Sequence, residues 1–220
     1  MIKFVAAVLM LIDHVGAILL PELPVLRVIG RLSMPMFAFS LARAFRFADN
    51  GNIINFKQYF CRLFTFSIVS QFPYHFFKND TLNIGFTWLL AFFFLSLLTH
   101  KKTINNYLLC ICIAAICATP FFLPIEYGIY GVVYPAMFHY CYYKLKKPEY
   151  AFAGSALLFV AWLVLDGSFL QVFAIFAAPL VLLLEKFDKK IIVSKWFYYG
   201  FYPVHIALLL LIRYCFFPHL

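Results

Sequence analysis

The sequence predicts an all-α, polytopic membrane helix bundle of about nine transmembrane helices, within a range of eight to ten, with a cytoplasmic N-terminus. First, 65% of the residues are apolar and only 12% are charged, whereas soluble domains have roughly 45–50% and about 25%. Second, the apolar residues form runs close to the ~20 residues that cross a bilayer. Third, the basic residues gather in alternate connections between these runs, which is typical of cytoplasmic loops.

Nine apolar runs follow one another along the chain. The first contains Asp13 and His14, begins with the single basic residue Lys3 and lacks a small-residue cleavage pattern, so we expect it to remain on the protein as a span. Because some runs are short, the range is eight to ten spans, and residues 1–220 are expected to form one integral-membrane domain. The runs cover residues 3–20, 26–45, 58–77, 82–99, 104–122, 127–143, 150–165, 168–184 and 196–216.

The net charge of +9 reflects membrane topology. With the N-terminus inside, most of the 18 basic residues fall in cytoplasmic connections. No interleaved basic and aromatic patch is long enough to follow a phosphate backbone, so nucleic acid is not an expected partner. The six cysteines have no metal-ligand spacing, and no metal site is predicted.

Asp13 and His14 are ionisable residues within the first apolar run, about ten residues from its start. Such groups are costly at membrane depth and are therefore candidates for function. A histidine there can exchange a proton near neutral pH. Neighbouring helical positions point about 100° apart, so Asp13 is expected to pair with an arginine elsewhere rather than with His14. The alternative is a structural polar contact between helices.

Arg27 and Arg31 lie four residues apart, on one face of the second predicted helix. The Pro-rich turn before them returns the chain toward Asp13, so they are expected to lie close to Asp13 and His14. They either bind an anion or neutralise Asp13; the alternative is that they extend to the headgroups, which suits Arg27 better than Arg31. A helix break at Pro35 is expected to turn backbone toward a cavity.

Four basic residues surround the connection between the second and third predicted spans. Together they can hold a polyanionic headgroup through charge-assisted hydrogen bonds, although cytoplasmic topology explains them equally well. Arg62 differs because it lies inside an apolar run and needs a partner. The four are Arg43, Arg46, Lys57 and Arg62.

Three further polar groups are candidates for lining a cavity. Their hydroxyl, amide and imidazole groups can bind a substrate, whereas the alternative for most tyrosines is an aromatic belt at the membrane interface. They are Ser70, Gln71 and Tyr74 beside Pro73, where the third span is expected to break; Tyr127, Tyr130 and Tyr134 on one face of the sixth; and Tyr198, Tyr202 and His205 beside Pro203 in the ninth.

The order of these motifs resembles the TraX family, membrane acetyltransferases associated with conjugative pilin. The resemblance begins with Ile2, Lys3 and Met10, which lead to residues 12–16, and continues with residues 26–37. It goes on through Tyr59, Arg62, Leu63 and residues 70–74, then through residues 82–84 and 86–87, and ends with residues 201–205. Residues 41–45 lack a glycine expected from the family. The resemblance implies a multi-pass protein of the bacterial inner membrane, related to the transmembrane acyltransferases. It further implies that acetyl-CoA enters from the cytoplasm, that His14 is catalytic, and that the acceptor, the N-terminus of pilin or another exported amine or hydroxyl, is presented outside.

On this interpretation, the cytoplasmic basic cluster holds the nucleotide end of acetyl-CoA. The pantetheine arm, roughly 15–20 Å long, then matches a half-span of helix and brings the thioester to His14. The imidazole either deprotonates the acceptor or is itself acetylated. Asp13 is expected to stabilise imidazolium, and Arg31 to hold Asp13 or the developing oxyanion. The expected acceptor-binding residues are Arg27, Ser70, Gln71, Tyr74, Tyr127, Tyr130, Tyr202 and His205.

Two other function classes fit the same features. A small-molecule transporter or lipid-carrier flippase also has polar, proline-broken spans, but the chain shows no internal repeat. A non-catalytic assembly subunit would use its polar residues to pair with a partner's spans, and would gain no thermal stability from acetyl-CoA.

Overall fold

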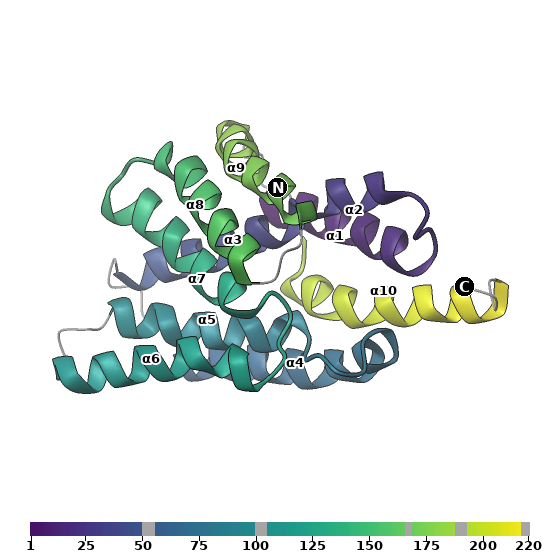
Figure 1. The fold of residues 1–220 in the computed structure, drawn as a ribbon, viewed down its shortest axis with the longest axis horizontal. Helices are drawn as coiled ribbons and strands as arrows, with labels where there is room; N and C mark the ends of the chain where they lie inside the picture. The colour runs from purple at the N-terminus through teal and green to yellow at the C-terminus, as the bar shows by residue number, and fades with distance from the viewer. Residues whose placement is uncertain (50–55, 100–104, 166–168, 188–192, 217–220) are drawn as a thin grey trace.

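The computed structural model describes residues 1–49, 56–99, 105–165, 169–187 and 193–216, and within these ranges the chain is helical (Figure 1). Extended backbone pairs there only at an isolated bridge between Leu82 and Ile125, so the all-α prediction is confirmed for the described ranges. The helices are α1 (Ile2–Ile18), α2 (Pro24–Gly30), α3 (Ser33–Asp49), α4 (Phe56–Phe77), α5 (Ile84–Thr99), α6 (Asn106–Phe122), α7 (Gly128–His139), the π-helix η2 (Tyr140–Lys144), α8 (Tyr150–Leu165), the 3₁₀-helix η3 (Phe169–Phe176), α9 (Ala177–Lys186) and α10 (Lys195–Phe216).

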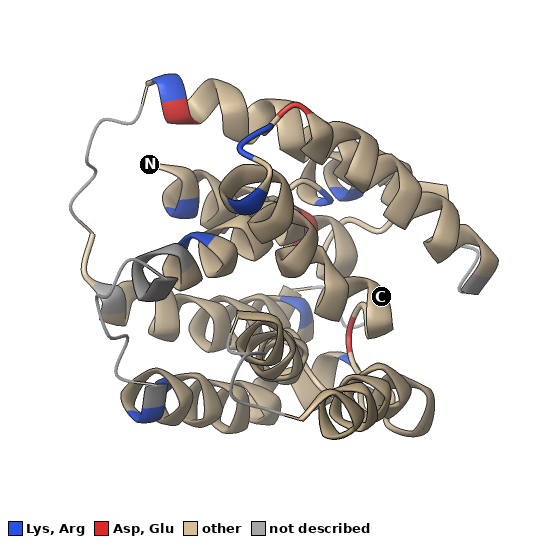
Figure 2. Cartoon of the chain, turned by 90° about the vertical axis from the view of Figure 1, so that its left-hand side faces the viewer, with Lys and Arg blue, Asp and Glu red and all other residues tan. Residues whose placement is uncertain are grey.

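The helices have the apolar surface of a membrane protein. Large side chains such as Phe122 (82% exposed) and Val164 (83% exposed) face outward, and charged residues are sparse along the ribbons (Figure 2). In the described ranges, Pro24–Phe45, Phe169–Lys186 and Trp196–Phe216 are long and apolar enough to cross a bilayer. The count of nine spans and the cytoplasmic N-terminus stay predictions.

The second predicted span is broken earlier than expected. Its helix ends at Gly30, a turn follows at Arg31 and Leu32, and α3 begins at Ser33. Pro35 causes this break, although the break lies a few residues before it. Proline has no N–H to bond the carbonyl four residues earlier, which belongs to Arg31. Pro35 itself lies in the first turn of α3, where a missing N–H is tolerated.

Two other features differ from the sequence prediction: the break at Pro73 and the position of Tyr127. Helix α4 continues through Pro73 to Phe77, so the polar stretch around Ser70 is helical. Tyr127 precedes α7 as its N-cap residue, in the left-handed region at φ 61°, so it does not share a helical face with Tyr130 as predicted. A non-glycine residue in this region is uncommon and is often held there at a functional site.

Helix α1 is the structural centre of the site, because it contacts α2, α3 and α10. Glycine permits the closest of these contacts: a Cβ on Gly30 of α2 would lie 2.2 Å from the Cβ of Asp13. Residues from both ends of the chain therefore meet beside Asp13 and His14.

The connection before α7 is held against the start of α5. The backbone N–H of Glu126 donates to the carbonyl of Leu82 (2.9 Å), and the N–H of Leu82 donates to the carbonyl of Pro124 (2.8 Å). The hydroxyl of Thr87 donates to the carbonyl of Glu126. These bonds fix the backbone at Glu126. Its side chain then lies near Asp13 and His14 of α1, which are far from it in the sequence.

Candidate functional site

Two cavities meet at His14. The larger, of about 840 Å³, follows α1 from Met1 to His14, and the smaller, of about 430 Å³, lies toward the other end of α1, beside Arg27 and Arg31. The residues that line both cavities are Asp13, His14, Glu126 and Tyr127. His14 therefore stands where a molecule in one cavity can reach a molecule in the other.

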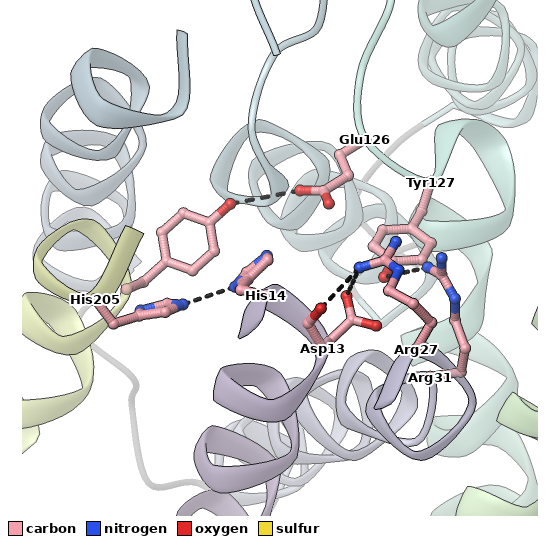
Figure 3. A network of polar contacts seen from close by, with 8 residues as sticks. Asp13, His14, Arg27, Arg31, Glu126, Tyr127 and His205 are labelled. Atoms are coloured by element: carbon pink, nitrogen blue, oxygen red, sulfur yellow. Dashed lines mark hydrogen bonds and ion pairs between the residues drawn. The ribbon is translucent and has the colours of Figure 1, made fainter. Parts of the chain in front are cut away.

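His14 is paired with His205, from the opposite end of the chain (Figure 3). The Nδ1 atom of His14 lies 2.7 Å from the Nε2 atom of His205, and both side chains are buried, at 5% and 4% exposure. The Nδ1 atom of His205 lies 2.6 Å from the carbonyl oxygen of Phe201. Carbonyl oxygens only accept, so His205 carries its proton on Nδ1 and accepts at Nε2.

This hydrogen-bond order assigns the tautomer of His14. Its Nδ1–H donates to His205, which leaves Nε2 as the atom with a free lone pair. Aromatic rings enclose the imidazole: the rings of Phe77 and Tyr202 contact it edge-on, each at 5.9 Å between centroids. His14 is thus an oriented base or nucleophile, with His205 as the group that orients it.

Asp13 is paired with Arg27. The sequence predicted that its partner is an arginine rather than His14. The Nη1 atom of Arg27 lies 2.6 Å from Oδ2 of Asp13 and also donates to the Asp13 backbone carbonyl at 3.1 Å. Asp13 points away from the His14–His205 pair (Figure 3). The ion pair therefore neutralises Asp13, and Arg27 is the partner instead of Arg31.

Arg31 lies beside the strained Tyr127. Its Nη1 atom donates to the Tyr127 hydroxyl at 3.4 Å, and its Nε atom is buried without a hydrogen-bond partner. The tyrosine hydroxyl is a neutral hydrogen-bonding group and brings no negative charge to the guanidinium. Arg31 consequently keeps its positive charge available to the smaller cavity.

Glu126 faces His14 across the site and was not among the sequence-predicted residues. The Tyr202 hydroxyl lies 3.5 Å from its Oε2 atom. Burial raises the pKa of the Glu126 carboxyl above its ordinary value. A carboxyl group that lines both cavities beside His14 can bind, or exchange a proton with, an acceptor amine or hydroxyl.

The basic residues predicted to bind a polyanion are separated by the structure. Arg43 lines the larger cavity together with Lys3, which was not among the predicted binding residues. Lys57 and Arg62 are absent from the lining of both cavities, and the side chain of Arg46 lies outside the described residues. The basic residues of the larger cavity are therefore Lys3 and Arg43.

The polar residues of α4 hold the fold near the site. The amide oxygen of Gln71 accepts from the backbone N–H of Asn83 (2.9 Å) and from its side-chain amide (2.8 Å). Ser70 and Tyr74 are buried, and neither they nor Gln71 line a cavity described here.

The tyrosines predicted to line a cavity divide into two groups. Tyr127, Tyr198 and Tyr202 line the larger cavity, as predicted. Tyr130 lies behind the smaller one, where its ring contacts Trp162 at 5.1 Å between centroids. Sequence periodicity alone did not separate these positions.

Three other residues of the smaller cavity were missed: Lys78, Trp162 and Gln171. For Gln171 a sequence signal existed, since it is a polar amide within the eighth apolar run and is only 1% exposed. A buried amide of this kind needs hydrogen-bond partners.

Comparison with known proteins places this architecture in a family. The family model described as TraX protein matches residues 1–213. The uncharacterized protein RP591 of Rickettsia prowazekii (strain Madrid E) is 49% identical over 39 residues, which are 18% of this chain and 16% of that protein. No solved structure matches the chain.

Proposed function

Because the chain belongs to the TraX family, we propose that it is a transmembrane acetyltransferase, which transfers the acetyl group of cytoplasmic acetyl-CoA to an amine or hydroxyl presented on the other side of a bacterial inner membrane. The family resemblance implies the N-terminus of pilin as the acceptor. The single observation that carries the proposal is the position of His14 between two cavities that meet only around it and three neighbours.

Acetyl-CoA is assigned to the larger cavity. Lys3 and Arg43 are the basic groups of its lining, and they would pair with the phosphates of the nucleotide end. His14 lies eleven positions after Lys3 on α1, which corresponds to about 16 Å of helix. That length is similar to the pantetheine arm, so the thioester would lie beside the imidazole.

The acceptor is assigned to the smaller cavity. In direct transfer, Nε2 of His14 takes the proton of the acceptor as its nitrogen or oxygen bonds to the acetyl carbon. The carbon–sulfur bond breaks, and the proton passes to the leaving thiolate, which gives free coenzyme A. In the stepwise alternative, Nε2 attacks the acetyl carbon first and the carbon–sulfur bond breaks, which releases coenzyme A as the thiolate. The acceptor then attacks the acetyl group on His14, the bond to Nε2 breaks, and the acceptor's proton passes to the thiolate. His205 holds the same nitrogen in place in both routes.

The test uses the purified full-length chain in detergent. Incubation with acetyl-CoA and a candidate acceptor peptide should release free thiol and add one acetyl group to the peptide, as measured by mass spectrometry. His14→Ala should abolish both signals. The matched control is His75→Ala, because His75 is exposed and lines neither cavity, and it should keep them.

Two results would overturn the proposal or its mechanism. Undiminished transfer by a correctly folded His14→Ala variant would remove His14 from the chemistry. The second result combines two observations: a solute or lipid moves across the membrane of liposomes that lack acetyl-CoA, and no acetyl transfer occurs when acetyl-CoA and an acceptor are supplied. This result would favour the transporter or flippase.

A further inference from the structure

Three residues that line the smaller cavity each carry a buried side-chain N–H group for which the described part of the chain offers no well-aligned hydrogen-bond acceptor. These groups are Nε of Arg31, Nε1 of Trp162 and Nε2 of Gln171. The Tyr130 hydroxyl lies near the Gln171 amide, but one hydroxyl can accept at most one of the two N–H groups of that amide, so the other still needs an acceptor. Each of the three nitrogen atoms is buried, and the whole Gln171 side chain is 1% exposed. Since buried donors are nearly always paired in folded proteins, three orphaned donors around one cavity indicate an acceptor-rich group that the protein is built to bind.

The three donors come from separate elements that the fold brings together. Arg31 follows α2, Trp162 lies on α8, and Gln171 lies on η3, which contacts both α2 and α8. The ring of Tyr130 packs against Trp162 and helps to hold the indole. These donors therefore have fixed positions, as a preorganised binding site requires.

The charges around the cavity favour an anion. Arg31 and Lys78 both line it, and within the described residues the Arg31 guanidinium donates to the neutral Tyr127 hydroxyl and not to a carboxylate. Arg27 also lines it but is neutralised by Asp13 at 2.6 Å. The remaining acidic group, Glu126, lies on the His14 side, where it also lines the larger cavity. Arg31 and Lys78 together outweigh this one remaining acidic group, so the lining as a whole favours a negatively charged ligand.

We infer that the smaller cavity binds an oxyanion, a carboxylate or phosphate, through Arg31, Trp162 and Gln171. This inference rests on the proposed function, and it narrows the acceptor to a molecule that carries an anionic oxygen group near its reactive amine or hydroxyl. The anionic group is held by the three donors, and the reactive group then faces His14. The anion comes either from the acceptor itself or from a membrane phospholipid headgroup, since both present the same oxygens.

Binding is measured on the full chain without acetyl-CoA, so the result does not depend on catalysis. Inorganic phosphate, and separately succinate, is titrated against protein in zwitterionic phosphatidylcholine nanodiscs, and the unfolding temperature is recorded at constant ionic strength. A saturable rise is expected. Gln171→Leu and Trp162→Phe should each weaken the apparent affinity roughly tenfold, because each removes a hydrogen bond to a charged group.

Two matched variants control for the substitutions. Trp196→Phe and Gln58→Leu make the same two substitutions at exposed positions that line neither cavity, and they should leave the anion affinity unchanged. Repetition in phosphatidylglycerol nanodiscs separates the two sources. Loss of the phosphate response there assigns the site to a lipid headgroup, and its retention assigns the site to a soluble anionic acceptor.

Absence of saturable binding by both anions, or unchanged affinity in both Gln171→Leu and Trp162→Phe, would overturn the inference. His14→Ala distinguishes this failure from failure of the proposed function. That variant should still bind phosphate, because His14 is not one of the three donors. If it binds phosphate and also still transfers acetyl groups, the anion site stands and the assigned role of His14 is lost.

Discussion

The contact between Gly30 and Asp13 gives a prediction that connects packing to activity. A Cβ at Gly30 would lie 2.2 Å from the Asp13 Cβ and 2.5 Å from its Oδ1 atom. Ordinary van der Waals contact begins near 3.4 Å, so Gly30→Ala must separate α2 from α1 by about 1.2 Å locally. The Arg27–Asp13 ion pair, now at 2.6 Å, would then be stretched beyond hydrogen-bond distance.

The expected magnitude follows from overpacking of a close helix contact. Overpacking costs about 1–3 kcal/mol, which corresponds to a fall in Tm of roughly 2–12 °C for a chain of this size. Displacement of catalytic groups by about 1 Å can reduce activity about 100-fold. Gly30→Ala should therefore be less stable and much slower in acetyl transfer than the wild-type chain.

Thermal unfolding of the purified protein in detergent checks the stability, and thiol release from acetyl-CoA checks the activity. Gly200→Ala is the matched control, because a Cβ at Gly200 meets nothing within 4 Å. Gly200 lies inside α10, so alanine should raise stability by about 0.5–1 kcal/mol there. A Gly30→Ala protein as stable and active as wild type would refute the packing argument.

Three further predictions concern the proposed chemistry. His205→Ala removes the acceptor that orients His14, so kcat should fall about 100-fold and its pH profile should shift while KM for acetyl-CoA stays near the wild-type value; an unaltered profile would remove His205 from this positioning role. Arg43→Gln should raise KM for acetyl-CoA about tenfold by loss of a phosphate contact, whereas Lys57→Gln, outside both cavities, should not; equal effects would contradict the assignment of the larger cavity. Burial raises the pKa of Glu126, so the folded chain binds its proton more tightly than the unfolded chain, and stability should fall as the pH rises above the ordinary glutamate range. Glu126→Gln should flatten this part of the plot of Tm against pH, and an equally steep plot would show that another group is responsible.

The sequence by itself determined that the chain is helical and belongs in a membrane. A bilayer requires every backbone polar group to be bonded internally, so long apolar runs are sufficient to predict helices, whatever their neighbours. The rarity of ionisable residues in these runs likewise identified Asp13, His14 and an arginine partner, because a buried charge needs compensation.

The tertiary structure decided which residues meet. His205 is 191 residues from His14 in sequence, and Glu126 and Gln171 come from other parts of the chain. Their meeting depends on how helices pack side by side, which is set by small contacts such as Gly30 against Asp13 and not by the periodicity of any one helix. The choice of Arg27 over Arg31 for Asp13 has the same origin: the two arginines share a helical face, and only the position of α2 against α1 determines which of them reaches the carboxylate.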